Sequence, residues 1–416
     1  MRFLYLQIIA SGLLLWRLFG SPCPSYAANK PVGSDSAKLA AVDPTPSVAI
    51  VSPVDGASVT ETNLTVRVNV RLPAGSTLRS VRAMVDGRLA AQVRGVRLMT
   101  SPAAPMDAPF THELTVSISP RDCVLTVVAE TSALKLEPAS VSLHWSGPDA
   151  SRNPEQRPRL YVLAVGVSDY QQSELRLRFA GKDARDLAEA FSKQGRTLYR
   201  SIETKILTDA GAKKNGILDG LEWLQRSTTA KDIAVLFLAG HGITDPSTGN
   251  YYFLPFDADM NGIKRSMIAE SELRDTLSSI PGKVLLFLDT CHAGKIFALT
   301  QGRGPGDLAS FVTELSSAEN GVVVFAASTG RQASQEAAAW NNGAFTKAVL
   351  EGLRGRADQQ KTGRVTLNML DLYISERVKQ LTEGRQTPTT AKPATIPDFP
   401  IAIVREVSND DVELVR

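Results

Sequence analysis

The sequence predicts an all-β sandwich over residues 47–146, followed by an α/β domain over residues 159–404 with a doubly wound, mostly parallel sheet and helices on both faces. Short β-prone runs separated by turn residues indicate the sandwich. Apolar runs that alternate with amphipathic helical patterns indicate the α/β domain. Of the 416 residues, 43% are hydrophobic and 21% are charged, which is enough apolar material for two packed cores.

The predicted sandwich contains short apolar runs with turn signals such as Asp55-Gly56 and Asp86-Gly87 between them. The segment lacks the Cys…Trp…Cys order of an antibody-type domain, and we expect Cys123 to be a core residue. It is similar to the immunoglobulin-like modules of exported bacterial proteins, and we expect it to bind another protein or a surface glycan. The predicted strands are residues 48–51, 64–70, 80–85, 114–118, 124–129 and 141–145.

A polar, proline-containing segment, residues 147–158, is predicted to link the two domains. Beyond it, apolar runs predict strands and amphipathic patterns predict the helices that connect them. The charged residues 405–416 are predicted to form a loose tail. The predicted strands are residues 160–167, 202–207, 232–239, 283–288 and 322–327, and the predicted helices are residues 183–193, 214–225, 270–279, 345–353 and 367–381.

The first 27 residues have the pattern of a secretory signal peptide. Arg2 precedes an apolar stretch of about 14 residues, which is shorter than the roughly 20 of a membrane span, and Ser25-Tyr26-Ala27 offers a cleavage site. We therefore expect an exported protein, periplasmic or secreted, with residues 28–46 as a linker; an uncleaved anchor is the alternative. The net charge is +3, and Arg2 and Arg17 supply two of these charges, so nucleic acid is not expected as a partner.

Two predicted strands are each followed by a reactive side chain. One leads into Gly240-His241-Gly242, and the other leads into Asp289-Thr290-Cys291. Because ligand sites gather at the carboxyl ends of strands in open α/β sheets, we expect His241 and Cys291 to meet at one edge. A thiol beside an imidazole is the arrangement of a cysteine nucleophile with a histidine base.

This pattern resembles the caspase-like cysteine peptidases, with metacaspases and their bacterial relatives closest, over residues 159–404. A caspase signature places its histidine about 50 residues before its cysteine, and His241 and Cys291 keep that spacing. The resemblance implies a caspase-like fold and a peptide or protein substrate. Further segments that support it are residues 160–170, 183–184, 251–257, 326–332, 343–346 and 386–388.

The resemblance implies a role for each residue. The thiolate of Cys291 attacks a peptide carbonyl, and His241 protonates the departing amine. The backbone N–H groups of Gly242 and Cys291 hold the oxyanion. We predict a dyad, because no third residue is required by the sequence. His292 is an alternative base, but it adjoins Cys291 and is interpreted as structural; a buried core thiol is the alternative interpretation of Cys291 itself.

In relatives, the position of Asp289 lines the pocket for the residue before the cut, so its carboxylate implies cleavage after Arg or Lys. The alternative interpretation is a carboxylate that caps a turn. Where similar metacaspases often carry a second Asp, in the segment matching residues 328–333, this chain has Gly330-Arg331. Arg331 would offset Asp289, and Glu336 is the nearby residue that would compensate.

No cofactor is required by this chemistry, and the cysteines and histidines lack the spacing of a zinc site. Residues 257–262 imitate the start of a calcium loop, but Ile268 stands where that loop requires Glu, so we predict a turn-rich loop. Calcium dependence remains an implication of the resemblance, without a location. Arg303 lies among glycines after the Cys291 segment and is a candidate self-cleavage site.

The sequence leaves two alternatives to a cysteine endopeptidase. One is a catalytically silent caspase-like scaffold that binds partners through the sandwich, although such a domain often loses one of Cys291, His241 and Gly242. The other is a related fold that cuts after Asn, which Asp289 disfavours because a carboxylate has no special match to an amide. A serine hydrolase is not supported, since no Gly-x-Ser-x-Gly motif occurs.

Overall fold

The computed structural model describes residues 45–73, 75–94, 110–147, 154–195, 197–245, 248–292, 308–317, 321–328, 334–393 and 395–404. The predicted signal peptide, residues 1–27, lies outside these ranges, as do the candidate cleavage site Arg303 and the pocket residue Arg331. Among the described residues, no helix combines the length and the apolar content that crossing a membrane requires.

The N-terminal part contains two sheets, as a sandwich requires. One sheet has the order β1-β3-β6, and the other has the order β2-β8-β7-β4-β5. Every second residue of β3, namely Val66, Val68 and Val70, is fully buried, which gives this strand one core face. Cys123 lies in the same core. The strands are β1 (Ser47–Ser52), β2 (Ala57–Val59), β3 (Asn63–Arg71), β4 (Leu78–Val85), β5 (Arg88–Arg94), β6 (Phe110–Ser117), β7 (Cys123–Thr131) and β8 (Ala139–Trp145).

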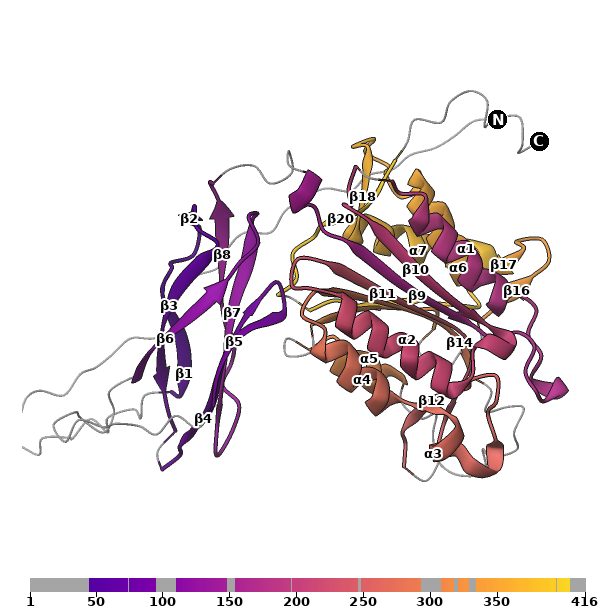
Figure 1. Ribbon diagram of the computed structural model, residues 1–416, viewed down its shortest axis with the longest axis horizontal. Coiled ribbons are helices and arrows are strands. Elements are labelled where there is room, and N and C mark those ends of the chain that lie inside the picture. Colours follow the sequence, from indigo (N-terminus) through magenta and orange to yellow (C-terminus); the bar gives the residue numbers. More distant parts are fainter. Residues whose placement is uncertain are drawn as a thin grey trace, which may run out of the picture. The chain divides into compact units, whose positions relative to one another are not determined.

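The second part is built on a mixed sheet with the order β10-β9-β11-β14-β15-β19, and a short β12-β13 pair joins it at β11 (Figure 1). The first five strands in this order run parallel, and β19 pairs antiparallel with β15. The strands are β9 (Leu160–Gly166), β10 (Ile202–Thr208), β11 (Ile233–Thr244), β12 (Tyr251–Phe253), β13 (Ile268–Ala269), β14 (Lys283–His292), β15 (Val322–Ala326) and β19 (Thr389–Ala391).

Helices cover both faces of this sheet (Figure 1). α1, α6 and α7 pack on one face, and α2, α4 and α5 pack on the other. Successive residues of β9 belong to the two cores in alternation. Leu160 and Val162 lie in the core on one face, and Tyr161 and Leu163 lie in the core on the other. The helices are α1 (Ala180–Ser192), α2 (Lys214–Ser227), α3 (Ile263–Ser266), α4 (Glu270–Ser279), α5 (Leu308–Leu315), α6 (Ala344–Glu351) and α7 (Leu367–Thr382), with a π-helical turn at Gly352–Arg356.

Two features differ from the prediction. The strands do not stop before His241 and Cys291, because β11 continues to Thr244 and β14 continues to His292. Glycine and histidine disfavour a strand in an isolated sequence, but the pairing between β11 and β14 extends both strands through these residues. The strand β5 and the helix α5, of 7 and 8 residues, were not predicted. Short elements were also missed, since their length gives no period: β2, β12, β13, β19, α3, β16 (Glu336–Ala337), β17 (Asn342–Gly343), β18 (Arg364–Thr366), β20 (Pro400–Ile403) and single 3-10 turns at Pro154–Gln156, Ser173–Leu175, Asp209–Gly211 and Met260–Gly262.

Candidate functional site

β11 and β14 lie side by side in the centre of the sheet and bring the two candidate residues together. Their parallel register pairs His241 with Cys291 and Gly242 with His292. The Cys291 and His292 side chains lie outside the described part of the structure, so the strand register is what places them. Both candidate positions stand at the carboxyl ends of neighbouring strands, as the sequence predicts for a site of an open α/β sheet.

The glycines on either side of His241 make room for aromatic side chains. A Cβ atom at Gly242 would lie 2.5 Å from the ring of Tyr251, and one at Gly240 would lie 2.7 Å from the Tyr170 hydroxyl. Gly240 also has a φ of 152°, which L side chains rarely adopt. These two positions therefore accept glycine alone without a shift of their neighbours.

The imidazole of His241 is buried, with 3% of its surface exposed. Its Nε2 lies 2.9 Å from the Leu175 carbonyl oxygen, which can only accept, so Nε2 carries the proton. Nδ1 has no hydrogen-bond partner among the described residues. Burial lowers the pKa of His241, while the Leu175 carbonyl raises it by a smaller amount. The geometry thus favours a neutral ring with a free lone pair on Nδ1.

The predicted dyad did not include Leu175, and no sequence signal points to it. Its contribution is a backbone carbonyl from the 3-10 turn Ser173–Leu175, which any residue type supplies. Only the path of the chain after β9 brings this oxygen to His241. Nδ1, which has no partner within the described part of the chain, is the ring nitrogen available for proton transfer.

A small acidic pocket lies beside His241. Asp289, Asp183 and Glu336 line it, together with Ala239 and Gly240 of β11. Its volume is about 10 Å³, which is room for about one water molecule. Asp183 was not named as a pocket residue from the sequence, where residues 183–184 support the family resemblance and Asp183 begins a predicted amphipathic helix.

Two of these carboxylates are buried and close together. Asp289 accepts hydrogen bonds from the hydroxyl and the N–H of Thr346, at 2.7 and 3.3 Å. Asp183 accepts from the Asn342 side chain and the Gly343 N–H, at 2.7 and 3.1 Å. Burial raises the pKa of both, and the Asp289 charge raises the pKa of Asp183 further. The pair therefore favours holding a proton or a cationic partner.

Glu336 has a second function in the structure. Its carboxylate accepts the backbone N–H groups of Arg178 and Phe179, at 3.1 and 3.4 Å, at the start of α1. Phe179 is the N-cap of α1, so its N–H has no partner within the helix, and the carboxylate also suits the positive end of the helix dipole. Glu336 therefore both lines the pocket and fixes the helix that carries Asp183.

The loop that imitates a calcium site uses its carboxylates for local structure. Asp257 accepts the N–H of Lys214 at the start of α2, and Asp259 accepts the N–H of Asn261 and bonds to Arg265. Within the described ranges, no group of three or more His, Cys, Asp or Glu side chains is placed to hold a metal ion.

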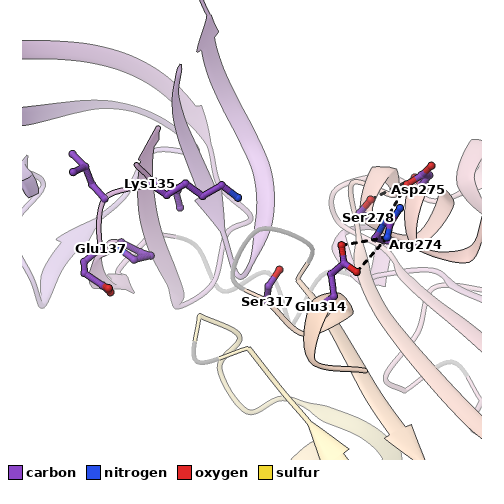
Figure 2. Close-up of a pocket in the computed structure, with 10 residues that line it drawn as sticks. Lys135, Glu137, Arg274, Asp275, Ser278, Glu314 and Ser317 are labelled. Atoms are coloured by element: carbon purple, nitrogen blue, oxygen red, sulfur yellow. Dashed lines mark hydrogen bonds and ion pairs between the residues drawn. The ribbon is translucent and has the colours of Figure 1, made fainter. Parts of the chain in front are cut away.

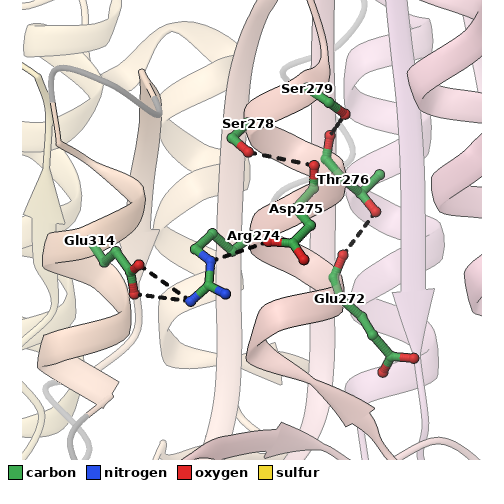
Figure 3. A network of polar contacts seen from close by, with 7 residues as sticks. All are labelled: Glu272, Arg274, Asp275, Thr276, Ser278, Ser279 and Glu314. Carbon is green, nitrogen blue, oxygen red and sulfur yellow. Dashed lines mark hydrogen bonds and ion pairs between the residues drawn. The ribbon is translucent and has the colours of Figure 1, made fainter. Parts of the chain in front are cut away.

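A larger pocket, of about 560 Å³, does not include His241 in its lining (Figure 2). Its charged residues include Lys135, Glu137 and Arg274. Arg274 bonds to Asp275 at 3.3 Å and to Glu314 of α5 at 3.2 Å, and so ties α4 to α5 (Figure 3). Its hydroxyl side chains are those of Ser278 and Ser317, and the Ser278 hydroxyl donates to the Asp275 carbonyl oxygen at 3.5 Å, so its volume alone gives it no claim to be the reactive site.

Comparisons with solved structures give weak matches. A protein of Geobacter sulfurreducens is 18% identical and covers 60% of this chain and 100% of its own, with a TM-score of 0.43. Fibronectin(III)-like modules of CbhA from Clostridium thermocellum are 18% identical, covering 24% of this chain and 45% of theirs, with a TM-score of 0.18. At these TM-scores the matches say nothing about function. No curated protein matches this chain.

Family models give the clearer result. The model described as a caspase domain matches residues 159–399, and the model described as a bacterial Ig domain matches residues 46–127. The first match covers more than half of the chain and includes His241, Cys291 and the acidic pocket. The second covers β1 to β6 and part of β7. This protein therefore belongs to the caspase-domain family of cysteine peptidases and carries a bacterial Ig-like domain ahead of its caspase domain.

Proposed function

We propose that this protein is a cysteine endopeptidase in which Cys291 is the nucleophile and His241 is the base. The observation that carries the proposal is the strand register that pairs these two positions, combined with a buried, neutral imidazole whose Nδ1 has no partner among the described side chains. A neutral imidazole with a free lone pair can take the thiol proton, and a thiolate is the form of cysteine that attacks carbonyls.

The reaction has two halves. The Cys291 sulfur forms a bond to the peptide carbonyl carbon, and the oxyanion of the tetrahedral intermediate accepts N–H groups of Gly242 and Cys291. Protonated His241 then gives its proton to the departing amine, which leaves an acyl-enzyme. Water, deprotonated by His241, hydrolyses the thioester and regenerates the thiol. The Leu175 carbonyl holds Nε2–H throughout and so stabilises the imidazolium.

The substrate residue before the cut is proposed to be Arg or Lys. Asp289 and Asp183 line one pocket next to His241, and a cationic side chain would relieve the repulsion between them. Glu336 adds a third carboxylate at the same pocket. Because the pocket holds only about one water, its wall must move outward for such a side chain to enter.

The test is hydrolysis of fluorogenic peptides that end in Arg, Lys, Asp or Asn, under reducing conditions, with and without calcium. Cys291→Ala and His241→Ala are the paired controls, and their circular dichroism must match that of the parent. Cleavage after Arg or Lys that is lost in both variants is the expected result. Cleavage after Asp alone would support the endopeptidase activity and contradict the proposed recognition of Arg or Lys by the acidic pocket. Inactivity of folded protein on every peptide would favour the scaffold alternative.

We make three further proposals, on export, self-cleavage and binding by the Ig-like domain. Export is tested by sequencing the N-terminus of the protein recovered from the cell envelope, where a start at Ala28 is expected. Self-cleavage after Arg303 is tested by comparing Arg303→Ala with Cys291→Ala: both must stay uncut at 303–304. Binding of a protein or glycan by the Ig-like domain is tested by pull-down with residues 45–147 as an added competitor to the full chain.

A further inference from the structure

The candidate histidine occupies a gap in its own sheet. On one side, β9 pairs with β11 only as far as Ala239, opposite Gly166. The short strand β12 pairs with β11 only from Gly242 onward, opposite Phe253. His241 stands between these two ladders, so its backbone N–H has no strand partner and needs another acceptor.

Tyr170 fills this gap. Its hydroxyl oxygen accepts the His241 backbone N–H at 2.7 Å and donates to the Leu254 carbonyl oxygen at 3.4 Å. The Leu254 N–H in turn donates to the His241 carbonyl oxygen at 3.0 Å. The hydroxyl therefore connects His241 to the chain beyond β12 and closes the break between the two ladders.

The ring of Tyr170 also packs against the imidazole. The two ring centroids are 5.2 Å apart, with the planes tilted by 36°, and Tyr170 is 7% exposed. A ring in this position excludes water from one side of His241. It belongs to the same segment after β9 that supplies the Leu175 carbonyl to Nε2, so one segment contacts the histidine at its backbone, its ring and its Nε2.

We propose that Tyr170 is a positioning residue for His241: its hydroxyl fixes the backbone of the histidine and its ring fixes the orientation of the imidazole. The inference rests on the proposed Cys-His chemistry. It gives Tyr170 no contact with the substrate, so its loss is expected to lower kcat and leave KM unchanged. Small displacements of a catalytic group reduce rates strongly, by up to about 100-fold for an error of about 1 Å.

The matched control is Tyr199, which is also buried and also donates a hydroxyl hydrogen bond to a backbone carbonyl, that of Ile401, at 2.8 Å. Tyr170→Phe and Tyr199→Phe each remove one buried hydroxyl and keep the ring. We expect Tyr170→Phe to lower kcat by about tenfold and Tyr199→Phe to leave it within about twofold of the parent, with similar losses of stability. Tyr170→Leu, which removes the ring as well, is expected to lower kcat by about 100-fold.

A spectroscopic measurement separates this inference from the proposed function. The Nε2–H proton of His241, identified by its absence in His241→Gln, is followed by NMR in the Cys291→Ala background, where activity plays no part. We expect it to exchange with water at least about tenfold faster in Tyr170→Phe than in Tyr199→Phe, because a loosened ring lengthens its bond to the Leu175 carbonyl.

The outcomes are distinct. Unchanged kcat and unchanged exchange in Tyr170→Phe would overturn the positioning role, even if Cys291→Ala abolishes cleavage. Equal losses of kcat in Tyr170→Phe and Tyr199→Phe would make Tyr170 a structural residue only and would also overturn the positioning role. If the parent protein cleaves no peptide, the proposed function fails, and the exchange rate of the His241 proton alone decides whether Tyr170 positions the ring.

Discussion

The substitution Asp289→Asn is expected to stabilise the folded protein at neutral pH while it weakens recognition of a basic residue. A Cβ atom at Gly343 would lie 2.9 Å from Oδ2 of Asp289 and 3.2 Å from Oδ2 of Asp183. The two oxygens are therefore no more than about 6 Å apart, and two ionised carboxylates at that distance repel each other by about 3 kcal/mol at an effective dielectric constant of about 20.

This repulsion corresponds to about 2 pKa units. It agrees in direction with the pKa of Asp183, which burial and then the Asp289 charge raise; burial and the Glu336 charge raise the pKa of Asp289. A carboxyl whose pKa is higher in the folded state than in the unfolded state stabilises the fold when protonated, and this contribution is lost as the pH rises through the folded-state pKa. The parent protein should therefore lose stability as the pH rises above about 4, the ordinary carboxyl value.

Asn at position 289 can still accept the Thr346 hydroxyl, so the substitution removes the charge and keeps the main bond. A hydrogen bond to a charged carboxylate is stronger than one to a neutral amide by about 1 kcal/mol. Because the repulsion that is removed is about 3 kcal/mol, the free energy of unfolding should rise by about 2 kcal/mol at pH 8. In the same variant, the loss of a buried charge partner is expected to lower kcat/KM for Arg peptides by at least about 30-fold. This factor corresponds to a loss of about 2 kcal/mol or more of interaction free energy with the Arg side chain.

The assay is urea unfolding of the parent and of Asp289→Asn at several values between pH 4 and pH 8. Asp232→Asn is the control, because Asp232 is also buried but accepts from Thr229 and Arg159, away from the pair. It should lose stability at every pH. The reasoning is refuted if Asp289→Asn is less stable than the parent at pH 8, or if the two proteins share one pH dependence.

Four further predictions concern single residues. Cys291→Ala is expected to lower peptide cleavage by about 1000-fold or more with unchanged circular dichroism; residual parent-like turnover would assign the nucleophile elsewhere. In a chain that starts at residue 45, a thiol reagent at pH 8 should label Cys291 and spare Cys123, whose pKa burial raises to about 12, and mass spectrometry of the labelled peptides decides this. Gly240→Ala should cost about 2 kcal/mol in urea unfolding, since its Cβ would lie 2.7 Å from the Tyr170 hydroxyl; an unchanged midpoint would contradict that contact. Asp257→Ala should cost about 1 kcal/mol through loss of the bond to the Lys214 N–H, and a Tm that calcium raises in the parent but not in this variant would instead make residues 257–262 a calcium site.

Much of the fold follows from periodicity in the sequence. The buried strands β9, β11, β14 and β15 are continuous apolar runs, and the helices α1, α2, α4 and α7 show the 3.6-residue pattern, so both kinds of element are predicted to within a few residues. The rule that sites gather at the carboxyl ends of parallel strands then places His241 beside Cys291, as the register shows. The short β12, β13, β16 and β17 escape prediction because two or three residues carry no period.

The sequence by itself determined which side chains are available: the thiol of Cys291, the imidazole of His241, the carboxylate of Asp289 and the glycines that flank the histidine. Only the tertiary structure decided what surrounds them. Asp183 comes from a helix 106 residues before Asp289, and the Leu175 carbonyl and Tyr170 hydroxyl come from a turn after β9. The reason is physical: a backbone oxygen is the same in every residue type, and contacts between distant segments depend on how the sheet is wound, not on any local pattern.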